Sequence, residues 1–196
     1  MYKLSHFTET DTEAVIAFMK ENSFAIITAV GETYPVATQV PLFIDINEAG
    51  KIFLTGHIMR KTDHHKAFEK NDQVLVLFTG PHTYVSASWY TTPQTASTWN
   101  YMTVHAKGKI TLLDEAATYE AIKNITEKYE GKETAAAFHK MEEGYIAAML
   151  KAIIAFSIEV ESIENVFKLS QNRDEQSKKN IIEALQQRPD DNSKMI

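Results

Sequence analysis

Runs of β-branched and aromatic residues, separated by turn-forming residues, recur along the chain and predict β-strands. The stretch SFAIITAVGETYPVATQVPLFID at 23–45 predicts two strands that turn near Gly31 and Glu32. Further strands are expected at 51–57, 73–81, 99–113 and 153–162.

Apolar residues three and four positions apart predict helices between these strands. The first helix is expected to begin near residue 11, with Thr10 or Asp11 as its N-cap. A longer helix is expected between Asp114, as its N-cap, and Gly131, as its stop signal. Further helices are expected at 62–71, 142–151 and 173–188.

The order of these elements predicts an α+β fold. Five or six strands, joined mostly by hairpin-length connections, favour an antiparallel barrel flanked by helices, with a C-terminal helix, over a βαβ sheet. One domain is expected over 1–188, followed by a polar tail at 189–196. The sequence contains no P-loop and no GxGxxG motif, so the common nucleotide-binding signatures are missing.

Composition narrows the classes of protein to consider. The chain has 196 residues, of which 44% are hydrophobic and 23% charged, as in an ordinary globular protein. It has no apolar run near the ~18 residues of a membrane span and no apolar signal core at its N-terminus. Cysteine is absent, so a cytoplasmic location is expected. The net charge of −6 disfavours a broad nucleic-acid-binding surface.

Arg60 and Lys61 form the first candidate site. They lie between a predicted strand and the start of a predicted helix, where backbone N–H groups and the helix dipole favour an anion. Arg offers a planar fork and Lys a point charge, a combination suited to phosphate. The alternative is a solvated basic loop.

Histidines near this junction raise the question of a metal site. His64 and His65 are adjacent, so on a helix their side chains diverge by about 100° and do not easily share one ion. His57 lies seven residues before His64, which is no recognised ligand spacing. No metal site is predicted.

Small hydroxyl residues alternate with larger side chains at 84–89. Gly80 and Pro81 are expected to break the strand that begins at 73. The chain is then expected to resume with Ser86 and Ser88 on one face, where they would admit a ligand closely and offer it hydrogen bonds. An ordinary half-buried strand explains the same pattern equally well.

The segment STWNYMTVHAKGKI at 97–110 concentrates ring side chains. On a strand, Trp99, Tyr101, Thr103 and His105 share one face and Asn100 lies on the other. Such a face could stack against a planar ring and form hydrogen bonds with it, although packing alone also explains aromatic residues.

A dense polar run follows the last predicted strand. Ser170 or Asn172 is expected to cap the final helix. The run holds more polar side chains than a cap requires: Lys168, Ser170, Gln171, Asn172 and Arg173.

Three blocks together resemble one family. GPHTYVSASWY at 80–90, TWNYMTVHAKG at 98–108 and FKLSQNR at 167–173 are similar to the signature blocks of the PaiB-type family, described as FMN-binding negative transcriptional regulators. The resemblance implies an FMN-binding split β-barrel, related to pyridoxamine-phosphate oxidases and flavin reductases. It also implies a homodimer with flavin sites between subunits, in which Arg60 and Lys61 hold the FMN phosphate.

The resemblance turns the candidate residues into one expected cofactor site. Asn100 is expected near the polar edge of the flavin ring, with a ring side chain over part of its face. No residue is an evident general base, so no catalytic residue is assigned. The expected FMN-binding residues are His57, Arg60, Lys61, Ser86, Ser88, Trp99, Asn100, Tyr101, His105, Gln171 and Asn172.

The expected function is a flavin-dependent or flavin-sensing regulator of transcription. The alternatives are a weak flavin reductase or oxidase, and an interaction protein that has lost its flavin or binds haem through His57, His64 or His105. The connection TTPQTAS at 91–97 is shorter than in comparable family members, which bears on flavin access. Direct DNA binding is disfavoured, because acidic residues dilute the basic ones at 173–188 and no helix-turn-helix pattern occurs.

Overall fold

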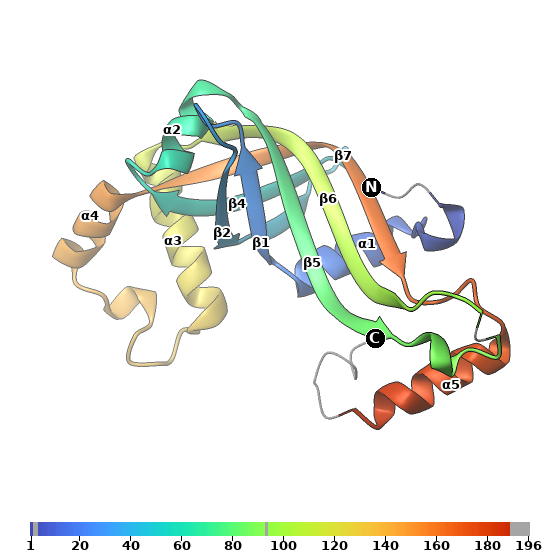
Figure 1. Cartoon of the computed structure of the whole chain (residues 1–196). Coiled ribbons are helices and arrows are strands. Elements are labelled where there is room, and N and C mark those ends of the chain that lie inside the picture. Colours follow the sequence, from blue (N-terminus) through green and yellow to red (C-terminus); the bar gives the residue numbers. More distant parts are fainter. Residues whose placement is uncertain (2–3, 93, 189–196) are drawn as a thin grey trace. The chain divides into compact units, whose positions relative to one another are not determined.

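The computed structural model describes residues 1, 4–92 and 94–188. Seven strands of the described chain form one antiparallel sheet in the order β2-β1-β5-β6-β7-β4-β3 (Figure 1). The strands are β1 (Phe24–Ala29), β2 (Val36–Pro41), β3 (Phe43–Ile46), β4 (Ile52–Met59), β5 (Gln73–Val85), β6 (Thr98–Leu112) and β7 (Ile153–Lys168).

Helices precede, connect and follow the strands. The α-helices of the described residues are α1 (Thr12–Glu21), α2 (Asp63–Lys70), α3 (Glu115–Tyr129), α4 (Glu143–Ala152) and α5 (Glu175–Gln186). Short 3-10 helices occur at η1 (Ser5–Phe7), η2 (Ala87–Trp89) and η3 (Phe138–Lys140). The α+β class and the antiparallel barrel flanked by helices, with a helix after the last strand, are confirmed.

The predicted helix ends are confirmed where a short acidic residue or a glycine marks them. Asp11 caps α1 by accepting a hydrogen bond from the Glu13 backbone N–H at 2.9 Å. Asp114 caps α3 in the same way through the Ala117 N–H at 2.8 Å. After α3 ends, Gly131 adopts a φ of 80°, which glycine reaches without strain.

The strand pattern differs from the prediction at 23–45, in β5 and at the end of β7. β5 runs without a break through Gly80 and Pro81 to Val85, so the predicted break there is wrong. Residues 23–45 form three strands rather than two, because buried Leu42 interrupts the run and donates its N–H to the Ser23 carbonyl. Strand β7 also continues past 162 to Lys168. Glu159 and Glu161 do not end the strand, because their side chains lie outside the core. Glu159 pairs with Lys51 of the β3–β4 turn, and Glu161 pairs with Lys109 of β6.

The described chain divides into two compact units, and β5, β6 and β7 contribute residues to both. Of the described residues, unit 1 draws on 1, 4–22, 77–92, 94–105 and 164–188, and unit 2 on 23–76 and 106–163. The single domain over 1–188 stays a prediction, and the predicted tail at 189–196 lies outside the described residues. Of the helices in the described ranges, none is long and apolar enough to cross a membrane.

Unit 2 has a core of alternating strand residues. In β1 every second side chain is buried, and Ile27 is completely so. Leu54, Phe156 and Ile158 are also fully buried, as expected for strands with one face on a core. Two strands approach closely at Gly108, where an added Cβ would lie 2.3 Å from the Glu159 carbonyl oxygen.

We therefore expect Gly108→Ala to destabilise the protein by about 3 kcal/mol or more, because backbone on β7 must move to admit the methyl group. Chemical denaturation measures the change. Gly144→Ala is the matched control, since Gly144 lies in α4 with nothing within 4 Å of its added Cβ. That change should leave stability equal or raise it by up to about 1 kcal/mol. A Gly108→Ala protein as stable as the wild type would contradict the close approach.

Candidate functional site

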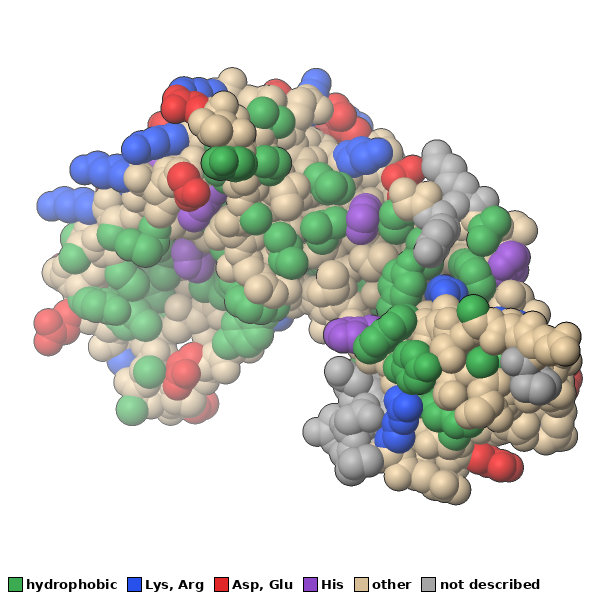
Figure 2. Space-filling view, viewed as in Figure 1, with side chains coloured by type: hydrophobic (Ala, Val, Ile, Leu, Met, Phe, Trp, Pro, Cys, Tyr) green, Lys and Arg blue, Asp and Glu red, His purple; other side chains and the backbone are tan. Residues whose placement is uncertain are grey.

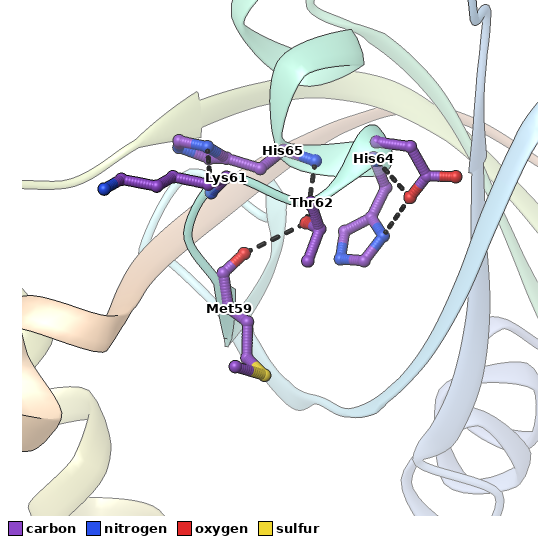
Figure 3. Close-up of polar contacts among 6 residues, drawn as sticks. Met59, Lys61, Thr62, His64 and His65 are labelled. Atoms are coloured by element: carbon purple, nitrogen blue, oxygen red, sulfur yellow. Dashed lines mark hydrogen bonds and ion pairs between the residues drawn. The ribbon is translucent and has the colours of Figure 1, made fainter.

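The β4–α2 junction in unit 2 carries the predicted phosphate-binding pair. β4 ends at Met59, and Thr62 caps α2 by accepting a hydrogen bond from the His65 N–H at 3.3 Å. The Thr62 hydroxyl also donates to the Met59 carbonyl at 3.0 Å, which closes the turn (Figure 3). Arg60 and Lys61 occupy this turn, as the sequence predicts.

Arg60 is anchored at one edge of its guanidinium group. Its backbone N–H donates to the Ala152 carbonyl at 2.8 Å, and its side-chain Nε donates to the Ile153 carbonyl at 2.9 Å. The side chain is half-buried. The two terminal Nη groups remain available as hydrogen-bond donors. Because the guanidinium group is planar, the Nε contact also orients them.

Lys61 has an unusual backbone. Its φ of 65° lies in the left-handed region, and its N–H donates to His65 Nδ1 at 3.2 Å. Its side chain is exposed and extends on the same side of the turn as the His65 ring (Figure 3). In the described part of the chain, neither Arg60 nor Lys61 has a carboxylate within 4 Å. Two cations are thus available to an external anion.

The start of α2 itself offers fewer donors than predicted. The His64 N–H donates to Asp63 Oδ1 at 2.8 Å, and the His65 N–H is taken by Thr62. This backbone hydrogen bond from His64 lowers the pKa of Asp63, so a carboxylate already lies in the first turn. Any anion bound here would depend mainly on the Arg60 and Lys61 side chains.

The neighbouring histidines diverge, as their sequence positions indicate. The His64 ring lies with Asp63, whereas the His65 ring lies beside Lys61 (Figure 3). Within the described ranges, no three His, Asp or Glu side chains are grouped as metal ligands.

His57 lines a cleft of about 440 Å³ in unit 2, between β3, β4 and α3. Burial lowers the pKa of its imidazole, so the ring is neutral at pH 7. Lys128 lies over the ring of Phe43 at 4.6 Å from its centroid, and Asn124 adds an amide. The cleft therefore offers an aromatic surface with neutral and cationic donors.

Unit 1 holds the ring residues of β6. Tyr101, Thr103 and His105 line one groove, as expected for one face of a strand, together with Val166 of β7. Thr103 donates its hydroxyl to the Phe78 carbonyl at 2.9 Å.

Trp99 on the same strand is 53% exposed and lies beside two rings of β5. Its ring centroid is 6.0 Å from that of His82 and 5.9 Å from that of Tyr84. Sequence reasoning missed these two partners. The positions 82 and 84 are two apart, which places both side chains on one face of a strand. The pairing of β5 with β6 that brings them beside Trp99 could not be predicted from these positions alone.

Asn100 lies on the opposite face of β6, as predicted. It is 1% exposed, and its Oδ1 accepts a hydrogen bond from the Ser170 hydroxyl at 2.8 Å. Ser170 has a φ of 62°. The buried pair joins the TWNY and KLSQN blocks, and a flavin contact by Asn100 stays a prediction.

The predicted strand through Ser86 and Ser88 is wrong. β5 ends at Val85, because the Ser86 side chain accepts a hydrogen bond from the Ser88 N–H and starts the 3-10 helix η2. The two hydroxyls lie 2.9 Å apart. The two hydroxyl groups therefore remain together, but at the start of η2 instead of on one face of a strand.

The predicted cap of the last helix is also wrong. Asp174, not Ser170 or Asn172, caps α5 through the Ser177 N–H at 2.9 Å. Hydrogen bonds from Ser177 are the main reason why the pKa of Asp174 falls to about 2, and Thr91 contributes another.

The remaining residues of this segment have separate partners. Gln171 accepts a hydrogen bond from the Leu169 N–H at 2.7 Å, and Asn172 is exposed. The Arg173 guanidinium lies 4.2 Å from the ring centroid of Tyr90. Burial, and then the charge of Arg173, lower the pKa of Lys168.

The predicted residues thus fall into two groups. His57, Arg60 and Lys61 lie in unit 2, within the last part of β4 and the turn after it. The others lie in unit 1: Ser86, Ser88, Trp99, Asn100, Tyr101, His105, Gln171 and Asn172.

Residues 1–162 match the family model described as "Putative FMN-binding domain". The chain belongs to this family. It is also 35% identical to the protein named Protease synthase and sporulation protein PAI 2 of Bacillus subtilis over 197 residues, covering all of this chain and 94% of that one. These matches confirm the PaiB-type resemblance and FMN as the cofactor.

Solved structures agree with the fold. The flavocytochrome Anf3 from Azotobacter vinelandii is 16% identical, with a TM-score of 0.65, and the match covers 86% of this chain and 72% of that one. The FAD and heme binding protein from Mycobacterium smegmatis is 14% identical, with a TM-score of 0.60, over 82% and 73%. The FMN-binding type of split β-barrel is confirmed.

We expect Ser170→Ala to lower the free energy of unfolding by about 1–3 kcal/mol, because it removes the donor to a buried Asn100 oxygen. Ser170→Gly should cost less, since glycine relieves the left-handed backbone. Urea denaturation measures both. Asn172→Ala is the exposed control and should change stability by less than about 0.5 kcal/mol. An unchanged Ser170→Ala protein would show that the buried pair contributes little.

Proposed function

We propose that this FMN-binding split-barrel protein is a flavin-sensing regulator of transcription in which Arg60 and Lys61 hold the FMN phosphate. The regulatory part is supported by the relative from Bacillus subtilis, whose name links it to protease synthesis and sporulation. The phosphate-binding part is supported by the geometry of the β4–α2 junction.

One observation carries the phosphate assignment. Two adjacent cations follow strand β4 without a carboxylate partner among the described residues, and the Arg60 guanidinium group is anchored through Nε. Anchoring at Nε leaves the two Nη groups free to bind two oxygens of one phosphate side by side. Lys61, the next residue, adds a point charge on an exposed side chain.

The residues fit FMN in the chemistry that they offer. A phosphate monoester carries nearly two negative charges at pH 7, which matches two cations better than a neutral ligand would. FMN supplies redox chemistry when bound, and the chain supplies binding and orientation. His57, as a neutral imidazole, can donate or accept one hydrogen bond in its cleft without adding charge. No residue is assigned as a proton donor or acceptor in a reaction.

A homodimer with flavin sites between subunits is part of this proposal. Helix α4 has the apolar sequence EGYIAAMLKA, yet none of its residues is buried, and Tyr145 is 59% exposed. Hydrophobic side chains gather on the viewed face over α3 and α4 (Figure 2). Met59, directly before Arg60, is likewise exposed. Apolar surface of this kind supports an interface with another copy.

Direct DNA binding is not favoured as the regulatory route. Three of the four basic residues at 173–188 have partners inside the chain: Lys178 pairs with Glu175 at 2.8 Å, and Arg173 stacks on Tyr90. Arg188 packs over Trp89 at 4.9 Å. These side chains are engaged within the chain, so regulation of transcription through the flavin-bound state of the protein is favoured over direct binding to DNA. A flavin reductase or oxidase is the second candidate, and it would use the same cofactor site.

The test is a double variant that removes both charges without forcing the backbone. Arg60→Gln with Lys61→Asn should weaken FMN binding about 100-fold, from the loss of two charge-assisted hydrogen bonds. Asn is chosen because it tolerates the left-handed backbone at position 61. Quenching of flavin fluorescence gives the affinity, and thermal denaturation checks the fold.

The matched control is Lys178→Gln with Lys179→Gln, which removes the same charge from α5. This control should bind FMN as the wild type does. If both double variants lose affinity equally, net charge rather than the junction governs binding. If neither does, the phosphate lies elsewhere.

A further inference from the structure

Lys61 occupies a backbone conformation that needs a compensating contact. At a φ of 65° the Cβ of an L-residue crowds its own carbonyl group, so glycine or asparagine usually fills such a position. The strain persists only where surrounding contacts fix the conformation. The question is therefore which group holds Lys61 in place.

His65 provides that contact. Its Nδ1 accepts the hydrogen bond from the Lys61 N–H at 3.2 Å (Figure 3). The residue is only 7% exposed, and its own N–H is bound by the Thr62 hydroxyl. The backbone bond fixes the residue in the first turn of α2, and burial restricts the ring, so Nδ1 is a positioned acceptor for the preceding turn.

The arrangement is a variant of the capping box. In the common form, the side chain at the third helical position reaches back to the N–H of the N-cap residue. Here Thr62 is the N-cap and His65 is at the third position, but the ring reaches one residue further, to Lys61. The His65 side chain therefore contacts the backbone of the residue that precedes the N-cap.

The contact also determines the state of the ring. A nitrogen that accepts a hydrogen bond carries no proton, so the neutral tautomer has its proton on Nε2. That Nε2 forms no hydrogen bond with the described residues, and its nearest carboxylate oxygen, Glu69 Oε1, is 3.8 Å away. The ring is thus held by Nδ1 and by packing rather than by Nε2.

We infer that His65 is a positioning residue for the anion site: it fixes the left-handed backbone of Lys61 and so directs the lysine side chain to the side where a phosphate group is bound. This inference rests on the proposed function. Without the acceptor, Lys61 relaxes to a right-handed or extended conformation, and its side chain no longer extends on the side of the His65 ring.

The experiment compares two substitutions at one position. His65→Asn keeps an acceptor oxygen close to the place of Nδ1, whereas His65→Leu keeps the bulk and removes the acceptor. We expect His65→Leu to weaken FMN binding about tenfold, as for one lost hydrogen bond, and His65→Asn to restore most of the affinity. His64→Leu is the control, because that ring contacts Asp63 and not Lys61.

A second readout needs no flavin. Exchange of the Lys61 amide proton, followed by NMR on the free protein, should be slow in the wild type and in His65→Asn, and at least about tenfold faster in His65→Leu. A wild type that does not bind FMN would refute the proposed function, while the exchange rates would still test the contact. Equal exchange in the wild type and His65→Leu, or equal FMN affinity despite faster exchange, would overturn the inference.

Discussion

The hydrogen bond between the Lys61 N–H and His65 Nδ1 is the contact on which the candidate site depends. It lies in the turn between β4 and the capped helix α2, and it holds a lysine in a conformation that lysine avoids. Arg60 is fixed separately, through Ile153 of the neighbouring strand. Two cations are therefore placed by backbone geometry rather than by acidic partners, which leaves their charge for a ligand.

Unit 1 is organised around a different buried contact. Asn100 and Ser170 bond to each other inside the unit, and the ring residues of β6 are consequently left on the other face. Trp99 is exposed there beside the rings of His82 and Tyr84 on β5. The polar run after β7 thus has a structural role through Ser170, next to any role in binding.

Local patterns predicted much of the fold. Asp11 and Asp114 were identifiable as caps because capping depends on neighbouring residues alone. The partner of Asn100 was not predictable, since it lies 70 positions away and depends on the register of the sheet. The cap of α5 was misplaced because several residues in that run could cap a helix, and tertiary contacts from Thr91 favour Asp174. The position of Arg60 and Lys61 just before a helix was predictable, and their phosphate-binding role stays a prediction. The left-handed backbone of Lys61 was not predictable, since neither lysine nor its sequence neighbours indicate it.

Comparing FMN with riboflavin in equilibrium titrations of the wild-type protein tests the central claim most directly. The two ligands share the ring and the ribityl chain, and only FMN carries the phosphate. If Arg60 and Lys61 bind that phosphate, FMN should bind about 100-fold more tightly than riboflavin, and the difference should shrink at high salt. Equal affinity for the two ligands would contradict the account.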